Sequence, residues 1–376
     1  MSEAPNYHNY IAGQWVAAAS GATGENRNPA TGALIGHFAR SAQADVDRAV
    51  TAAQVAFASW RKHPAPRRGE ILYRVGAILA RRKEEIARSM TEEMGKVLVE
   101  ALGDVQEGID MAYYMAGEGR RLFGQSVPAE LPNKAALAVR DPLGVVACIT
   151  PWNFPIAIPS WKTMAALIAG NTIVLKPASD TPLSAIKLVE VFEEAGLPPG
   201  VLNIVTGGGS EVGMPLVQHP EVAAISFTGS NEVGREVNVA AARQLKRVAL
   251  ELGGKNAVMV LDDADLDLAV EGILWSAFGT TGQRCTACSR LIAQRGVRDE
   301  LEHRLVERIK RLRLGNGLDP ATEVGPVVNA GQLERIHSFM EVARADGARI
   351  ATGGQPAREG DLVHGHFYRP TLLTGV

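Results

Sequence analysis

The chain has few cysteines, no long apolar run and almost no net charge. Only Cys148, Cys285 and Cys288 occur in 376 residues, which is too few for a disulfide framework. We therefore expect a reducing, cytoplasmic location. No stretch approaches the roughly 20 apolar residues that span a bilayer. The first residues, MSEAPNYHNYIAGQW, lack the basic start and the apolar stretch of a secretory signal.

Charge and composition exclude two classes of partner. The formal net charge is −2, which gives neither a basic surface for nucleic acid nor a polybasic membrane anchor. We expect no nucleic-acid partner and no membrane partner. Apolar residues make up 46% of the chain and charged residues 21%, the profile of an ordinary soluble enzyme. This length favours two or more structural units with a large core.

The pattern of apolar residues changes near Val145. Before it, helical periodicity covers Gln43–Trp60 and Arg67–Glu93. After it, short apolar strands alternate with helices, which predicts βαβ units and a mostly parallel sheet with helices on both faces. The expected strands are 145–150, 171–177, 201–207, 223–229 and 247–253, and the expected helices are 163–170, 184–196, one near 211–217 and one from Glu232.

A second α/β segment follows Gly254. Its expected strands are 256–262 and 289–294, and its expected helices are Leu266–Phe278, Asp299–Arg313 and Ala330–Asp346. The stretch 122–144, with its three prolines and mixed polarity, is interpreted either as a β-hairpin or arm that leaves the domain or as a surface loop.

A cysteine pair lies in the segment GQRCTAC at 282–288. A free thiol has a pKa near ~8.5, so a nucleophilic cysteine needs help to ionise. Cys285 lies in a loop rich in Gly, Thr and Ala, where exposed backbone amides would lower its pKa; a buried, inert thiol is the alternative. The spacing Cys285-x-x-Cys288 also suggests half a zinc site or a redox pair, but no second CxxC or paired His is nearby. We expect no metal.

Two polar residues stand at expected strand ends. Glu251 ends RVALELGG, where flanking apolar residues would partly desolvate the carboxylate and raise its pKa, as a general base requires; a surface Glu is the alternative. Asn153 lies within PWNFP, where two prolines restrict the backbone; a turn-forming Asn is the alternative. The segment FTGSNEVG at 227–234 ends a strand and opens a helix, as in a phosphate site, or forms a plain strand–helix turn.

In this order, PWNFP, FTGSNEVG, ELGG and GQRCTAC resemble the NAD(P)-dependent aldehyde dehydrogenase superfamily, and the resemblance runs from NYIAGQW to the last residue. It implies a parallel-sheet cofactor domain at 1–122 and 141–252, a protruding oligomerisation arm at 123–140 and a catalytic α/β domain from 253 onward. It makes Cys285 the nucleophile that attacks an aldehyde. By the same resemblance Glu251 activates the water that hydrolyses the thioacyl intermediate, and Asn153 with the Cys285 N–H forms the oxyanion hole.

The resemblance also implies an NAD or NADP site. Its residues would be Trp152, Lys176, Ser179, Gly209, Gly229, Ser230, Gly234 and Leu252, with Lys176 at the ribose and Gly209 near the adenine. Many members that prefer NAD⁺ have a Glu where this chain has Ser179. Without that carboxylate a 2′-phosphate meets less repulsion, so NADP⁺ should be tolerated or favoured, although the neighbouring Asp180 opposes this.

The substrate set consists of Arg284, Phe154 and Trp161. A guanidinium just before the nucleophile would pair with a carboxylate of a semialdehyde such as 2-oxoglutarate semialdehyde; a structural or solvent-facing Arg is the alternative. The family continues past a stretch like FYRPTLLTGV into a Glu-x-Phe-Gly-Pro motif, which this sequence does not contain. We therefore expect a C-terminally truncated chain. The resemblance implies a homodimer or homotetramer, and the truncation would leave part of that oligomer surface uncovered. The rival hypothesis is a non-catalytic homologue that keeps only binding or assembly roles.

Overall fold

The computed structural model describes residues 4–376 and divides into two compact units. The first unit comprises the described residues up to Glu25 together with Gly36–Ile86 and Asp104–Glu251. The second comprises Asn26–Ile35, Ala87–Gly103 and Leu252–Val376.

Two stretches that the sequence assigned to the first domain, 26–35 and 87–103, belong to the second unit. Backbone hydrogen bonds tie each to distant parts of that unit. The Leu98 N–H donates to the Gly317 carbonyl at 3.0 Å, and the His366 N–H donates to the Pro29 carbonyl at 2.9 Å. Because these partners lie far apart in the sequence, local patterns gave no sign of them.

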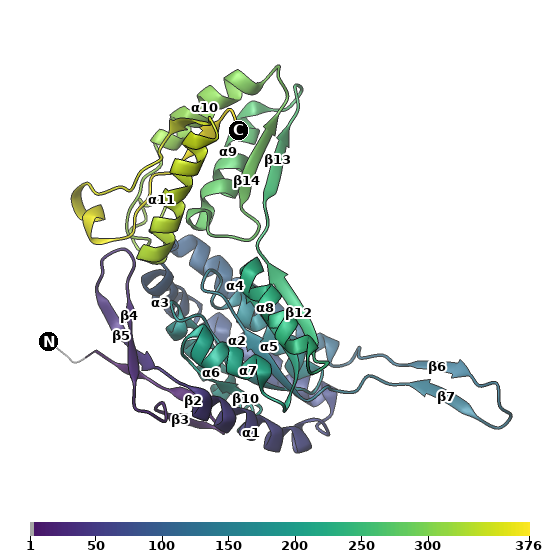
Figure 1. Cartoon of the computed structure of the whole chain (residues 1–376). Coiled ribbons are helices and arrows are strands. Elements are labelled where there is room, and N and C mark those ends of the chain that lie inside the picture. The colour runs from purple at the N-terminus through teal and green to yellow at the C-terminus, as the bar shows by residue number, and fades with distance from the viewer. Residues whose placement is uncertain (1–3) are drawn as a thin grey trace. The chain divides into compact units, whose positions relative to one another are not determined.

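A seven-stranded sheet forms the centre of the first unit (Figure 1). Its strands are Asn9–Ile11 (β2), Gln14–Val16 (β3), Val145–Ile149 (β8), Thr172–Lys176 (β9), Leu202–Ile204 (β10), Val222–Gly229 (β11) and Arg247–Leu252 (β12). The order is β12-β11-β8-β9-β10-β2-β3. Strands β11, β8, β9 and β10 pair in parallel, while β2 joins β10 antiparallel. The predicted, mostly parallel sheet is confirmed, and every residue of β8 and β9 is buried, as such sheets require.

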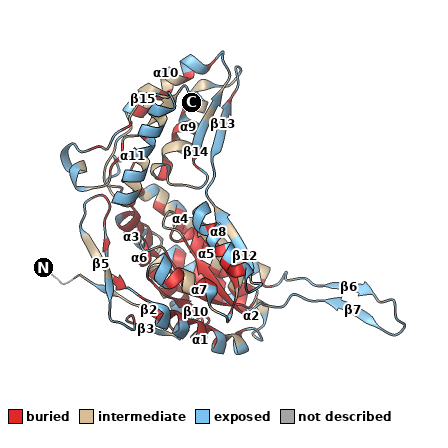
Figure 2. Ribbon diagram, in the orientation of Figure 1, coloured by how far each residue is buried: buried red, intermediate tan, exposed pale blue. Residues whose placement is uncertain are grey.

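Eight α-helices lie among the described residues between β3 and β12. They are Gln43–Trp60 (α1), Ala65–Arg81 (α2), Lys83–Met94 (α3), Leu98–Glu118 (α4), Ala157–Ile168 (α5), Pro182–Glu194 (α6), Met214–Gln218 (α7) and Asn231–Ala242 (α8). Figure 2 shows that buried residues concentrate in the sheet and the helices packed around it. Within the described residues, no helix is long and apolar enough to cross a membrane.

The helical periodicity predicted over Arg67–Glu93 is confirmed, but two helices, α2 and α3, share this stretch. The backbone leaves the helical conformation at Arg82 (φ −93°, ψ 9°). There the guanidinium donates to Glu85 and Glu190 at 2.9 Å. Glu190 lies on α6, so a tertiary ion pair anchors the break.

The stretch 122–144 contains a β-hairpin, not an irregular loop. Gln125–Pro128 (β6) and Ala135–Ala138 (β7) pair antiparallel over four positions. Asn133, in the turn, adopts the left-handed conformation (φ 60°) that Asn tolerates better than most residues. Both strands are almost wholly exposed (Figure 2). A separate small sheet of Asn6–Tyr7 (β1), Leu34–Ala39 (β5) and Thr23–Arg27 (β4) has the order β1-β5-β4.

The second unit contains two small sheets and three long helices. Its elements are Asn256–Val260 (β13), Leu266–Phe278 (α9), Cys288–Ala293 (β14), Arg298–Lys310 (α10), Ala330–Ala345 (α11), Arg349–Thr352 (β15) and Leu372–Thr374 (β16). Strands β13 and β14 pair in parallel, and β15 and β16 pair antiparallel. Helices α9 and α10 pack on β13 through an apolar core that includes Val260, Ile273 and Leu305. The predicted helix over Leu266–Phe278 is confirmed at both ends.

Candidate active site

The predicted site residues fall into two groups, one in each unit. In the first unit they stand at the carboxyl ends of neighbouring strands of the large sheet. Trp152 and Asn153 follow β8, Lys176 ends β9, Gly209 follows β10, and Gly229 ends β11. Ligands of parallel α/β sheets bind outside this edge, so the topology gathers the residues where a ligand would bind.

Lys176 is the buried cation of this group. Its side chain is only 6% exposed, and its Nζ donates to the Pro177 carbonyl at 2.9 Å. Burial lowers the pKa of Lys176 to about 8, and the charges of Asp180 and Glu211 only partly oppose this. A cation held in this way suits a ligand rich in hydroxyls or negative charge.

We expect Lys176→Met to stabilise the fold at pH 7. One pKa unit corresponds to about 1.4 kcal/mol, so the buried charge costs up to roughly 3 kcal/mol. Between pH 8 and 10.5 the unfolded chain binds more protons than the folded one, so the wild type regains stability there and the advantage of Met shrinks. Denaturant unfolding at pH 7 and pH 10 measures this. The exposed Lys62→Met is the control, and destabilisation by Lys176→Met at pH 7 would show the account to be wrong.

The start of α8 fits a phosphate. Ser230 caps this helix, its Oγ accepting the Val233 N–H at 3.2 Å, and Gly234 lies one turn further on. The first backbone N–H groups of a helix carry a partial positive charge and favour an anion. At Gly229 a Cβ would also lie 2.5 Å from the Phe227 ring, so a larger residue would require that ring to move.

A tight loop after β10 contains Gly209. Gly209–Gly213 is a π-helical turn, and a Cβ added at Gly209 would meet nothing within 4 Å. Ser179 closes the loop from the other side, since its Oγ donates to the Gly207 carbonyl at 3.0 Å. The Ser179 hydroxyl thus has a structural partner, and Gly209 leaves open space for a flat group to approach.

The turn after β8 carries the expected oxyanion donor and two expected substrate residues. Trp152, Asn153 and Phe154 are partly buried, and Trp161 on α5 is 41% exposed. Sequence reasoning missed Asp104, a buried residue of α4 whose carboxylate accepts the Ala157 N–H at 2.7 Å. This bond caps the start of α5 and fixes where the turn ends.

Glu251 differs from expectation. The sequence predicted a partly desolvated carboxylate, but Glu251 is exposed. It lies on β12, an outer strand of the sheet where exposed and partly buried residues alternate, and its side chain is on the exposed face. Leu252, the last residue of β12, is partly buried. The packing of this unit therefore does not desolvate the Glu251 carboxylate.

Lys162 is a second residue that sequence reasoning missed. It lies on α5, its Nζ donates to the Ser226 Oγ at 2.9 Å, and it interacts electrostatically with Glu251. Burial lowers the pKa of Lys162, while the Cys148 thiol and Glu251 raise it. Lys162 is the one charged residue of α5, but its partners lie far along the chain, so the local sequence did not indicate its role.

In the second unit, Cys285 is an exposed thiol on a restrained turn. Its carbonyl accepts the Asn256 Nδ2 at 2.6 Å, and the same nitrogen donates to the Ala287 carbonyl at 3.2 Å. Cys288 is partly buried, and its thiol donates to the Arg290 carbonyl. Cys148 is fully buried in the first unit, where desolvation raises its pKa to about 12. Of the three, Cys285 has the exposure that a nucleophile needs.

The contacts of Arg284 favour its structural alternative. The guanidinium donates to the carbonyls of Trp275 at 2.5 Å and Ser276 at 3.0 Å, and lies 4.3 Å from the centre of the Trp275 ring. These carbonyls end helix α9, where a cation is favoured by the helix dipole.

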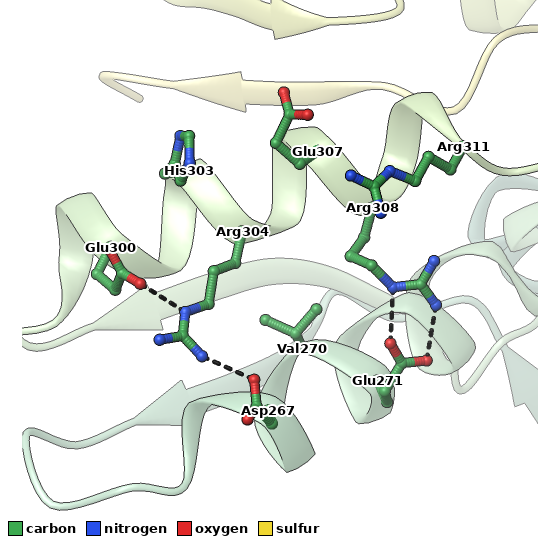
Figure 3. Close-up of a pocket in the computed structure, with 9 residues that line it drawn as sticks. All are labelled: Asp267, Val270, Glu271, Glu300, His303, Arg304, Glu307, Arg308 and Arg311. Carbon is green, nitrogen blue, oxygen red and sulfur yellow. Dashed lines mark hydrogen bonds and ion pairs between the residues drawn. The ribbon is translucent and has the colours of Figure 1, made fainter.

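A charged groove also lies between α9 and α10 (Figure 3). Arg304 bridges Asp267 and Glu300, and Arg308 forms a paired contact with Glu271. None of the predicted site residues is among the nine that line this groove. Two of the arginines that line it, Arg304 and Arg308, already bind carboxylates.

The aldehyde dehydrogenase family model matches residues 15–376 of the chain. The chain belongs to this family. It is 42% identical to the alpha-ketoglutaric semialdehyde dehydrogenase of Bacillus subtilis, over 100% of this chain and 77% of the relative. It is 43% identical to the alpha-ketoglutarate semialdehyde dehydrogenase of Haloferax volcanii, over 98% and 76%.

Solved structures agree with the family assignment. Betaine aldehyde dehydrogenase from Staphylococcus aureus in complex with NAD⁺ superposes with a TM-score of 0.97 at 38% identity, covering 98% of this chain and 74% of that chain. The family and the α/β fold inferred from the four motifs are thereby confirmed. As an aldehyde dehydrogenase family member, the chain is an oxidoreductase that acts on aldehydes.

Proposed function

We propose that this aldehyde dehydrogenase oxidises a carboxylate-bearing semialdehyde, such as 2-oxoglutarate semialdehyde, to the corresponding acid with NAD⁺ or NADP⁺. The observation that carries the proposal is the exposed Cys285 thiol on a backbone-restrained turn. The identity to two ketoglutarate semialdehyde dehydrogenases supports the substrate class.

The chain's own residues divide the chemistry between them. The Cys285 thiolate attacks the aldehyde carbon and forms a thiohemiacetal. The Asn153 side-chain amide and the Cys285 backbone N–H donate to the oxyanion that develops on the former carbonyl oxygen. Loss of a hydride from the thiohemiacetal carbon, for which a bound nicotinamide would be the acceptor, leaves a thioester on Cys285. Glu251 then takes a proton from the water that cleaves this thioester and releases the acid.

The first unit has the donor set that a dinucleotide requires. The N-terminus of α8, capped by Ser230, fits the phosphates, and the buried Lys176 fits the ribose. Gly209 leaves room beside the loop after β10 for the adenine. When bound, the nicotinamide supplies a hydride acceptor. Trp152 and Leu252 complete the proposed cofactor set, and Ser179, being uncharged, places no carboxylate against a 2′-phosphate.

Arg284 alone does not account for recognition of a substrate carboxylate. Its guanidinium is engaged by the carbonyls that end α9. Phe154 and Trp161 provide apolar surface in the first unit.

We also propose a cytoplasmic location and a homo-oligomer built through the β6–β7 arm. Three free cysteines fit a reducing compartment, and the arm's almost wholly exposed strands fit a partner surface.

Matched aldehydes test the substrate class. We expect kcat/KM for glutarate semialdehyde to exceed that for pentanal at least tenfold, because the two differ mainly in a terminal carboxylate whose pairing is charge-assisted. Formation of NADH or NADPH is followed with each cofactor in turn. Equal values, or a preference for pentanal, would contradict the semialdehyde proposal. Turnover with neither aldehyde would favour the rival, a non-catalytic homologue.

A further inference from the structure

The turn that leads into Cys285 has an unusual backbone. Thr280 (φ 51°, ψ 33°) and Thr281 (φ 58°, ψ 31°) are consecutive residues in the left-handed region. A β-branched side chain rarely adopts this conformation, because its Cβ crowds the neighbouring carbonyl oxygen. Two such residues in a row persist only where surrounding contacts hold them.

Glu100, in the first turn of α4, supplies those contacts. Its two carboxylate oxygens accept the Thr280 N–H at 2.8 and 2.9 Å, and one of them accepts the Thr280 hydroxyl at 3.2 Å. The Thr281 hydroxyl donates to the Gly325 carbonyl at 3.1 Å. All these residues belong to the second unit.

Arg284 closes the turn from its other end. A Cβ added at Gly279 would lie 2.8 Å from the Arg284 Nη2 and 3.1 Å from the Glu100 Oε1. Both charged groups therefore lie against the position that a Gly279 side chain would occupy, and they attract each other electrostatically. Only glycine fits there without moving one of them.

We propose that Glu100 is a positioning residue that, together with Arg284, holds the Gly279–Arg284 turn in its left-handed form and so sets the position of Cys285. The inference rests on the proposed role of Cys285 as nucleophile. Cys285 directly follows this turn, and the Asn256 side-chain amide donates to the Cys285 carbonyl. The backbone is thus fixed on both sides while the thiol stays exposed.

The surroundings of Glu100 indicate which replacement should be mild. Burial raises its pKa, whereas the Thr280 N–H, Lys96, the Thr280 hydroxyl and Arg284 lower it. An uncharged amide avoids the desolvation cost and keeps one carbonyl oxygen to accept the Thr280 N–H. Glu100→Gln should therefore preserve the turn, and Glu100→Ala should release it.

Hydrogen exchange of the peptide spanning residues 279–288 tests the inference. We expect Glu100→Ala to speed exchange in this peptide at least tenfold, and Glu100→Gln to stay within threefold of wild type. Asp110→Asn is the matched control. Asp110 is an exposed residue on the same helix, and its carboxylate accepts one hydrogen bond, from the Gln106 side-chain amide. This variant should leave exchange unchanged.

A glycine background separates release of strain from general loosening. Thr280→Gly keeps the backbone N–H and adopts the left-handed conformation freely. The residue 280 N–H loses its acceptor in both backgrounds and is left out of the comparison. For the amides of residues 281–288, Glu100→Ala in the glycine background should change exchange by less than threefold, as a coupled pair requires. Wild-type exchange in Glu100→Ala, or an equal acceleration in both backgrounds, would overturn the inference.

Turnover provides the second readout. We expect Glu100→Ala to lower kcat about tenfold or more with the aldehyde KM within threefold, since small misplacements of a reacting group are costly. Glu100→Gln should restore most of kcat. If Cys285→Ala keeps turnover, the proposed function fails. If Cys285→Ala is inactive and Glu100→Ala matches wild type in exchange and kcat, the inference alone fails.

Discussion

Cys285→Ala should abolish oxidation of every aldehyde that the wild type accepts, with a loss of at least about 10⁴-fold in kcat. Without the thiol no covalent intermediate can form, and neither other cysteine replaces it. Cys148 is fully buried with its pKa raised to about 12, and the Cys288 thiol is directed to the Arg290 carbonyl. Reduction of NAD⁺ and NADP⁺ by the variant gives the measurement.

Cys288→Ala is the matched control for this result. It removes a thiol from the start of β14 and leaves Cys285 and its bond to Asn256 in place. We expect it to keep kcat within about threefold of wild type. Loss of turnover in Cys288→Ala together with activity in Cys285→Ala would reverse the assignment of the nucleophile.

Glu251→Gln should slow steady-state turnover by about 10² or more, the usual contribution of a general base. Acyl transfer to Cys285 does not need this carboxylate, but hydrolysis of the thioester does. We therefore expect a burst of about one reduced cofactor per Cys285, followed by a slow steady state. Stopped-flow absorbance of the reduced nicotinamide resolves the two phases.

Glu236→Gln on α8 is the control, because Glu236 is also an exposed glutamate of the first unit. It should show wild-type turnover. If Glu251→Gln instead loses the burst as well as the steady state, Glu251 acts before the thioester forms. Unchanged turnover would mean that another group activates the water.

The sequence predicted the fold best where local pattern and tertiary packing agree. Strands β8 and β9 are short, apolar and followed by turns, and each lies where the pattern placed it. The break at Arg82 was missed because it depends on Glu190 of another helix. Helix α4 was not predicted at all. Its three glycines, Gly103, Gly108 and Gly117, weaken any helical pattern, and packing overrides that preference.

The sequence indicated which residues form the candidate site better than it indicated their burial and contacts. The resemblance carried by the four motifs pointed to Cys285 and Lys176, and the structure shows Cys285 exposed and Lys176 buried. Glu251 was expected to be partly desolvated, yet exposure depends on which face of an outer strand it occupies. Asp104, Lys162 and Glu100 act through contacts distant in sequence, so no local pattern could reveal them.

The most direct test of the account is to locate the acyl group on the protein. Glu251→Gln is mixed with glutarate semialdehyde and NADP⁺, quenched in acid and digested, and the peptides are weighed. The account predicts one adduct on Cys285, with the mass of the aldehyde less two hydrogens. An adduct on another residue, or none despite formation of reduced cofactor, would contradict covalent catalysis through Cys285.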